Sequence, residues 1–155
     1  MLSESPFSFT PNISPQTVTL RGRLDAVYRY AEGTIEIVDF KSGRAPRSDS
    51  LSSRAQFILP AETAVQMAAY GLLALDAWAV APHNLRTTVC YLGDQEPVLH
   101  TMDWTSEIAQ VQRNVIRTHI NKALSGSSAV LPGDACTHCD FNAFCEGAMQ
   151  RKPAL

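Results

Sequence analysis

Residues 23–43, RLDAVYRYAEGTIEIVDFKSG, are the most informative part of the sequence about the expected fold. It joins two segments whose side chains are typical of half-buried strands: residues 17–30, which alternate between apolar and polar, and residues 34–41, which are rich in β-branched residues. The AEG triplet at 31–33 supplies a turn between them, so the stretch predicts a hairpin. One face of its first strand is expected to be apolar, formed by Val18, Leu20, Leu24 and Ala26.

The segments after the hairpin predict further helices and strands. Residues 61–80, dense in alanine and leucine, are expected to form a helix, and residues 85–93 and 97–103 two more strands around a GDQE turn. Residues 104–125 predict an amphipathic helix, and two alternating phenylalanines near the start of the chain allow a short edge strand. This order predicts the α/β class, a mixed β-sheet with α-helices packed against it. The residues expected on the inner face of the second helix are Ile108, Val111, Val115 and Ile116.

Composition places the chain among globular proteins. Its 155 residues suit one domain, and its 45% hydrophobic and 18% charged residues do not fit a disordered chain. The net charge of −2 gives no overall basic signal for nucleic acid, but it is compatible with a local basic patch. No apolar run reaches the ~20 residues that span a bilayer, so no membrane partner is expected. The start, MLSESPFSF, does not resemble a signal peptide, so we expect a cytoplasmic protein whose four cysteines are thiols or metal ligands.

Charged residues of the hairpin indicate a possible chemistry. Alternation along a strand puts Asp39 and Lys41 on one face and Val38 and Phe40 on the other, and Asp25 can lie near the first pair across the hairpin. Two carboxylates beside an ammonium form a pocket for a hard divalent cation such as Mg²⁺, and the lysine can polarise a water or stabilise charge on a phosphate. This arrangement suits metal-assisted hydrolysis of a phosphodiester. The alternative is a surface hairpin with a cross-strand ion pair.

Four motifs in a fixed order give the chain a family resemblance. They are GRLDAV, IVDFKSG after the turn, Q-x-x-x-Y from Gln66 to Tyr70, and C-x2-C-x5-C near the end. Together they resemble the PD-(D/E)XK nuclease superfamily, in its RecB-like and CRISPR-associated branch that carries an iron–sulfur cluster, over residues 17–146. The resemblance implies a restriction-endonuclease-like core in residues 1–130 and a cysteine-bearing tail in residues 131–155.

The resemblance also implies the catalytic residues. Asp25 corresponds to the first metal-binding aspartate, and Asp39 and Lys41 correspond to the acid and the lysine of the (D/E)xK signature. The residue between them, Phe40, would offer its backbone carbonyl to the metal. The implied cofactor is Mg²⁺ or Mn²⁺, and the implied activity is hydrolysis of phosphodiester bonds in DNA.

Two further sets of residues are candidates for DNA contacts. Gln66 and Tyr70 match the motif thought to help hold DNA in the resembled branch, and positions i and i+4 share one helix face, so an amide and a stacking ring could point into one groove. The alternative is a tyrosine packed in the core with a polar neighbour. Arg44, Arg47 and Arg54 follow the lysine in a polar loop that could contact phosphates, or could simply be solvated.

The cysteines near the end predict a second metal site. In the resembled branch, Cys136, Cys139 and Cys145 would be the last three thiolates of a [4Fe–4S] cluster, whose fourth ligand lies far upstream. Here no cysteine precedes the first catalytic aspartate, and Cys90 lies within a strand pattern that predicts a buried core position. His138 could supply a nitrogen, which would suit Zn²⁺ better than iron.

The upstream region of the family pattern has no counterpart in this sequence. Family members carry a helix there with a histidine or glutamate that completes the metal site, whereas the residues before Asp25 predict strand and loop and contain only Glu4 as a substitute, which is otherwise an exposed residue. We therefore expect a C-terminal portion of a larger family member, or a natural short form. The remainder of a larger nuclease or helicase–nuclease complex is the implied partner.

Three functions remain open from the sequence. The first is a metal-dependent DNA nuclease, an exonuclease or end-processing enzyme of recombination, repair or CRISPR adaptation, which acts on single-stranded DNA or DNA ends. The second is a catalytically incomplete nuclease-fold domain that binds DNA or a protein partner. The third is a metal-binding structural module whose acidic residues serve only the fold.

Overall fold

The computed structural model describes residues 2–13, 17–46 and 59–126, together with Cys136, Cys139 and Cys145 as single residues. The chain divides into two compact units, Met1–Ile120 and Asn121–Leu155. No helix among the described residues is long and apolar enough to cross a membrane. The elements are β1 (Leu2–Phe9), β2 (Leu20–Arg29), β3 (Ile35–Lys41), α1 (Ala61–Asp76), the 3-10 helix η1 (Pro82–Asn84), β4 (Leu85–Tyr91), β5 (Val98–Asp103) and α2 (Ser106–Leu124).

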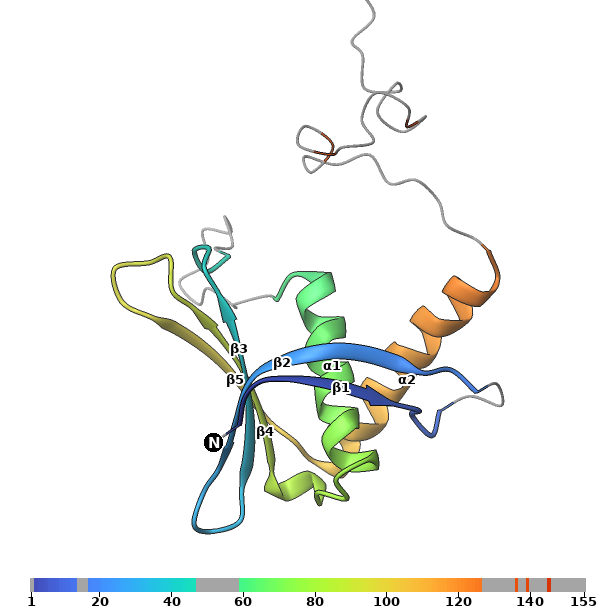
Figure 1. The fold of residues 1–155 in the computed structure, drawn as a ribbon, viewed down its shortest axis with the longest axis horizontal. Coiled ribbons are helices and arrows are strands. Elements are labelled where there is room, and N and C mark those ends of the chain that lie inside the picture. The colour runs from blue at the N-terminus through green and yellow to red at the C-terminus, as the bar shows by residue number, and fades with distance from the viewer. Residues whose placement is uncertain are drawn as a thin grey trace, which may run out of the picture. The chain divides into compact units, whose positions relative to one another are not determined.

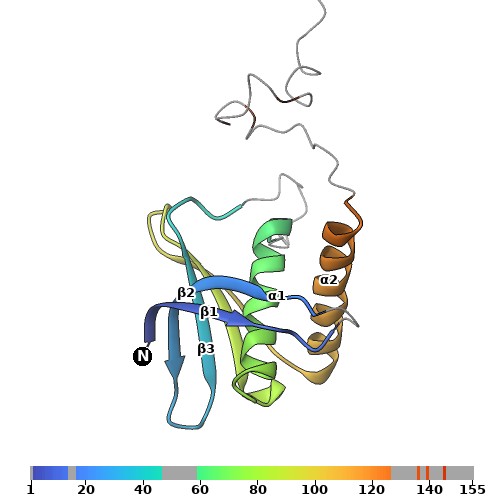
Figure 2. The same ribbon diagram turned by 45° about the vertical axis from the view of Figure 1, so that its right-hand side comes forward.

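The five strands form one mixed sheet in the order β1-β2-β3-β4-β5. Neighbouring strands are antiparallel except β3 and β4, which run parallel and are joined through α1, as a parallel pair requires a crossover. Both helices lie on the same side of the sheet, with α1 next to the strands (Figures 1 and 2). The predicted α/β class is confirmed, and each predicted helix and strand forms with its ends at most four residues from the expected bounds.

The core fills the space between the sheet and the two helices. Trp104, 2% exposed, lies at its centre, where its indole N–H donates to the Thr87 hydroxyl at 3.1 Å. Its ring packs directly against the backbone of α1 at Gly71, where any side chain would collide with it. The strands contribute Ile37 and Val89, which are almost completely buried. This packing fixes α1 against the centre of the sheet.

The inner face of α2 differs in part from the prediction. Ile116 is buried as expected, but Val111 is 57% exposed. The buried positions are Ala109, Ile116 and Ile120, which recur at intervals of seven and four and form one narrow stripe. Val111 lies about 200° around the helix from Ala109, because each residue turns an α-helix by about 100°. The prediction was therefore wrong at Val111.

The β1–β2 hairpin bends over α1. β2 pairs with β3 only from Ala26 to Arg29, while its first half pairs with β1 alone and curves away (Figure 1). On this curved part, the Phe7 ring lies over Gly22 and meets the Tyr70 ring edge-on, with ring centroids 5.7 Å apart. The hairpin therefore covers the middle of α1.

Because of this bend, the residues predicted to form one apolar face of the first strand do not all lie in one cluster. Leu24 joins the main core, but Ala26 lies in a separate small cluster with Val38 and Cys90. Leu24 and Ala26 would share a face on a regular strand, and the curvature of β2 between its two pairing partners separates them. Cys90, 5% exposed, is buried as predicted.

Candidate active site

The end of β3 carries the central acid of the site. Asp39 is only 2% exposed, and it shares the inner face of the strand with Ile37. Phe40 lies on the opposite face and is 42% exposed. The alternation expected from the sequence is thus present, and it directs a carboxylate toward α1, where an apolar residue would ordinarily lie.

Lys41 is the charge partner of this buried carboxylate. Its Nζ lies 2.7 Å from Oδ2 of Asp39, and its side chain remains 31% exposed. Burial raises the pKa of Asp39, the ion pair with Lys41 lowers it, and the negative charge of Asp25 raises it further. A buried carboxylate with a raised pKa and a second acid nearby gains from any additional cation.

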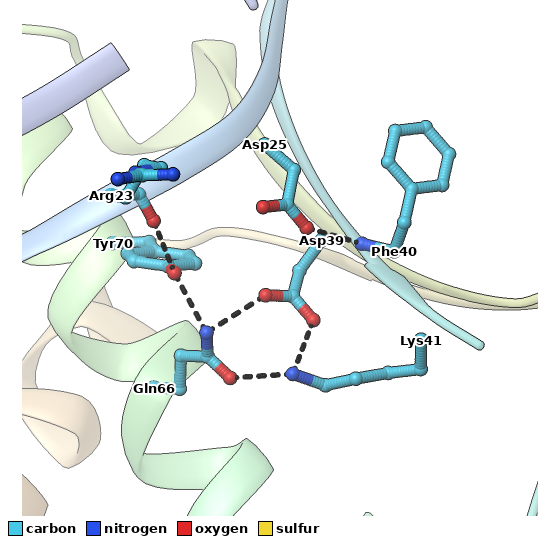
Figure 3. A network of polar contacts seen from close by, with 7 residues as sticks. All are labelled: Arg23, Asp25, Asp39, Phe40, Lys41, Gln66 and Tyr70. Atoms are coloured by element: carbon cyan, nitrogen blue, oxygen red, sulfur yellow. Dashed lines mark hydrogen bonds and ion pairs between the residues drawn. The ribbon is translucent and has the colours of Figure 1, made fainter. Parts of the chain in front are cut away.

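Asp25 reaches the same point from β2. Its Oδ2 accepts the backbone N–H of Phe40 at 2.8 Å, just beyond the last β2–β3 pair, Ala26 with Val38 (Figure 3). This hydrogen bond fixes the Asp25 carboxylate beside the backbone between Asp39 and Lys41. The structure therefore brings together all four residues that the sequence proposes for the metal and the catalytic lysine.

Gln66 joins these residues to α1. Its Nε2 donates to Oδ1 of Asp39 at 2.8 Å and to the Tyr70 hydroxyl at 2.7 Å, and its Oε1 accepts from Lys41 Nζ at 2.8 Å (Figure 3). The Tyr70 hydroxyl in turn donates to the carbonyl oxygen of Arg23 at 2.7 Å. One amide therefore contacts both the acid and the lysine of the site.

Tyr70 is part of the core as well as of this network. It is 4% exposed, and burial raises the pKa of its hydroxyl, with the nearby charges of Asp39 and Asp25 adding to the effect and the Gln66 hydrogen bond opposing it. The hydroxyl therefore stays protonated and able to donate. The stacking role predicted for Tyr70 does not fit this burial, because the ring has no open face for a base.

The oxygen donors of the site suit a hard divalent cation. Asp25 on β2 and Asp39 on β3 offer carboxylates, and Phe40, next to Asp39 in β3, has a backbone carbonyl. These oxygen donors suit Mg²⁺ or Mn²⁺ with water as further ligands. Oδ2 of Asp39 is fully buried, and among the described residues its only polar partner is the Lys41 ammonium. Within those residues, no three His, Cys, Asp or Glu side chains come together as a complete metal site.

Two arginines that the sequence analysis did not single out flank the site. Arg21 and Arg23 are exposed on β2, on either side of Gly22, and lie four and two positions before Asp25, respectively. Arg44, also exposed, follows Lys41 on the other side, and none of these three arginines has an ion pair within the described ranges. The R-x-R-x-D spacing at 21–25 was the available signal, because alternate residues of a strand share one side.

The turn between β4 and β5 holds the segment that carries Arg44. Leu92 N–H donates to the carbonyl of Lys41 at 2.8 Å, and Gly93 N–H donates to that of Gly43 at 3.0 Å. The N–H of Ala45 donates to an Asp94 carboxylate oxygen at 2.9 Å. The path of the chain is therefore fixed as it leaves Lys41. Arg47 and Arg54 lie outside the described residues.

The predicted second metal site lies in the segment of which the structure describes only three residues, the cysteines themselves. Of its three cysteines, Cys139 is exposed, Cys136 and Cys145 are half-buried, and the N–H of Cys139 donates to the carbonyl of Cys136 at 3.4 Å. His138 and the side chain of Glu4 lie outside the described part of the chain. The cluster and its ligands stay a prediction.

Comparison with known proteins bears on the family and the fold. The sequence profile of the PD-(D/E)XK nuclease superfamily matches residues 2–146. No curated protein sequence matches the chain. Among solved structures, SSO0001 is 14% identical with a TM-score of 0.56, over 95% of this chain and 60% of that chain. The "Putative exonuclease" of Eubacterium rectale is 12% identical with a TM-score of 0.52, over 99% of this chain and 53% of that one.

These comparisons show the fold and the family. The chain spans 60% and 53% of the lengths of these two structures, which share its fold at low sequence identity. Its mixed sheet with flanking helices is the restriction-endonuclease-like arrangement, and the profile match extends from β1 into the cysteine segment. The chain belongs to the PD-(D/E)XK nuclease superfamily.

Proposed function

We propose that this chain is a metal-dependent DNA nuclease that hydrolyses phosphodiester bonds at the end of β3. The main support for this function is the buried Asp39 carboxylate, which is paired with Lys41 at 2.7 Å and lies beside Asp25. A nuclease-family fold that places two acids and a lysine at one strand end has the groups that phosphodiester hydrolysis requires.

Each residue has a distinct role in this proposal. Asp25, Asp39 and the Phe40 carbonyl would hold Mg²⁺ or Mn²⁺, which supplies Lewis-acid stabilisation of phosphate charge when it is bound. Lys41, with its partly exposed ammonium, orients the attacking water or neutralises charge on the phosphate in the transition state. Gln66 holds Lys41 and Asp39 in position relative to each other by hydrogen-bonding to both.

The DNA strand would cross the site between two sets of guanidinium groups. Arg21 and Arg23 lie before Asp25 on β2, and Arg44 lies after Lys41. Phosphate contacts from arginine position the strand without reading its sequence. We extend this contact set to Arg47 and Arg54 from the sequence alone.

More specifically, we propose that this nuclease is an exonuclease or DNA-end-processing enzyme of the RecB-like and CRISPR-associated branch. It would act in recombination, repair or CRISPR adaptation. The Q-x-x-x-Y motif and the name of the Eubacterium rectale protein support it. The chain spans little more than half of that protein, so the remainder of a larger nuclease or helicase–nuclease complex is the proposed partner. In this assignment the three cysteines near the end bind a [4Fe–4S] cluster or Zn²⁺.

A catalytically incomplete, DNA- or protein-binding domain is the second candidate. The observation that favours it is the lack of a third acidic or histidine ligand beside Asp25 and Asp39 within the described residues. Two carboxylates are enough for Mg²⁺ when water completes the coordination, but weak metal binding would leave the chain inactive.

Two measurements separate these candidates. Calorimetry with Mn²⁺ should give binding heat for the parent and none for Asp25→Asn, while Asp103→Asn, which changes an exposed acid on β5, should bind as the parent does. Mn²⁺-dependent degradation of labelled single-stranded DNA should occur with the parent and disappear with Asp39→Asn. Metal binding without degradation supports the incomplete domain. Equal Mn²⁺ heats for the parent and Asp25→Asn would place the metal elsewhere.

A further inference from the structure

We propose that Tyr70 is a positioning residue whose hydroxyl anchors the Gln66 amide to β2 and thereby holds the Lys41 ammonium in place. The inference rests on the proposed role of Lys41 in hydrolysis. It assigns Tyr70 an internal role in place of a contact with DNA. It follows from the directions of the four hydrogen bonds that the Tyr70 hydroxyl and the Gln66 amide make (Figure 3).

The direction of the first bond is fixed by the backbone. The carbonyl oxygen of Arg23 can only accept, so the Tyr70 hydroxyl at 2.7 Å must give its single proton to it. The oxygen of Tyr70 is then left as an acceptor. The Gln66 atom 2.7 Å from it must therefore be the nitrogen, which donates.

The orientation of the Gln66 amide determines which of its atoms faces Lys41. With the amide nitrogen toward Tyr70 and Asp39, the amide oxygen lies 2.8 Å from Lys41 Nζ, which can only donate. The ammonium thus has two acceptors on the protein, Oε1 of Gln66 and Oδ2 of Asp39. A reversed amide would direct two N–H donors at the ammonium and its oxygen at the carboxylate, so that all three contacts of Gln66 would be lost.

The Tyr70 hydroxyl can anchor the Gln66 amide because the tyrosine is buried. Tyr70 is 4% exposed, and its ring meets Phe7 edge-on at 84°, so water does not compete for its hydroxyl. Gln66 is half-buried, and Asp39, Lys41 and Tyr70 all require the same orientation of its amide. Of these three partners, Tyr70 is the one that ties the amide to the backbone of β2. The Tyr70 hydroxyl is bonded to the backbone carbonyl of Arg23 on β2, two residues before Asp25. The same strand therefore fixes one metal-site acid and, through Tyr70, the lysine.

The kinetic test uses Tyr70→Phe, which keeps the ring and removes only the hydroxyl. We expect kcat for DNA degradation to fall about tenfold, as for one lost hydrogen bond to a positioned group, with KM changed less than about twofold. Tyr30→Phe is the matched control, because it removes a short hydroxyl–carboxylate bond to Glu36 outside this network and should leave kcat unchanged. In the double variant with Gln66→Ala, Tyr70→Phe should cause no further loss, since Tyr70 acts through Gln66.

A second test does not depend on activity. In the parent, both Nε2 protons of Gln66 are hydrogen-bonded and should exchange slowly with solvent by NMR; in Tyr70→Phe they should exchange at least about tenfold faster. If the parent does not cut DNA, the proposed function fails. The exchange rates of the Gln66 amide protons still show whether Tyr70 anchors that amide. Unchanged Gln66 exchange in Tyr70→Phe, or additive losses in the double variant, would overturn the inference.

Discussion

Gly71→Ala is expected to destabilise the fold, although an alanine is normally favoured over glycine inside a helix. The gain in helix propensity is about 1 kcal/mol. Against it, the new Cβ would lie 1.8 Å from Cζ2 and 2.1 Å from Cη2 of Trp104. Both distances are far inside van der Waals contact, so either the ring or α1 must move.

The tryptophan cannot move cheaply. It is 2% exposed, its indole N–H is bonded to Thr87, and its backbone N–H donates to the carbonyl of Leu85 at 2.9 Å. Overpacking in such a core costs about 3 kcal/mol, the upper end of the usual range. The net loss is therefore about 2 kcal/mol, which lowers Tm by roughly 4–8 °C for a chain of this size.

Urea and thermal unfolding followed by tryptophan fluorescence will measure this loss, because Trp104 is buried whereas the other tryptophan, Trp78, is 40% exposed. Repeating Gly71→Ala in a Trp104→Phe background, which removes the colliding atoms, should recover most of the loss. Unfolding of these variants is followed by circular dichroism, because the buried fluorophore is absent. The activity of Gly71→Ala should also fall, because a shift of α1 moves Gln66 away from the lysine. A Gly71→Ala protein as stable as the parent would refute the packing argument.

Three further predictions concern the site and its support. Lys41→Ala should abolish kcat while changing DNA affinity less than about threefold, because its role belongs to the transition state; cleavage at the parental rate would remove it from the mechanism. Arg21→Ala combined with Arg23→Ala should reduce the salt dependence of single-stranded DNA binding by about 1.4 in log–log slope, from two lost phosphate contacts, and an unchanged slope would exclude them. Burial would raise the pKa of Asp76, but Arg113 and a backbone N–H lower it overall, so this ion pair stabilises the fold above about pH 4 and is lost as the pH falls further. Acid unfolding of Asp76→Asn should accordingly lack this pH dependence, and an unaltered acid transition would contradict the assignment.

The sequence by itself was sufficient for features that depend on neighbours along the chain. Alternation with a period of two placed Asp39 and Lys41 on one face of β3 and Phe40 on the other, and the strand and helix segments followed from the same local patterns. It failed for Val111 on α2, because the choice of buried face depends on where the rest of the core lies. The family motifs likewise indicated which residues belong to the site before any contact was known.

Only the tertiary structure decided how those residues meet. Gln66 contacts Asp39 across 27 positions of sequence, and Tyr70 reaches the carbonyl of Arg23 across 47. These contacts depend on the register of α1 against the sheet and on the bend of β2, which are set by packing and not by local periodicity. A polar pair spaced i, i+4 on a helix is compatible with a DNA groove or with a buried network. The burial of the Tyr70 ring selects the network, because a side chain enclosed by the core must find its hydrogen-bond partners within the protein.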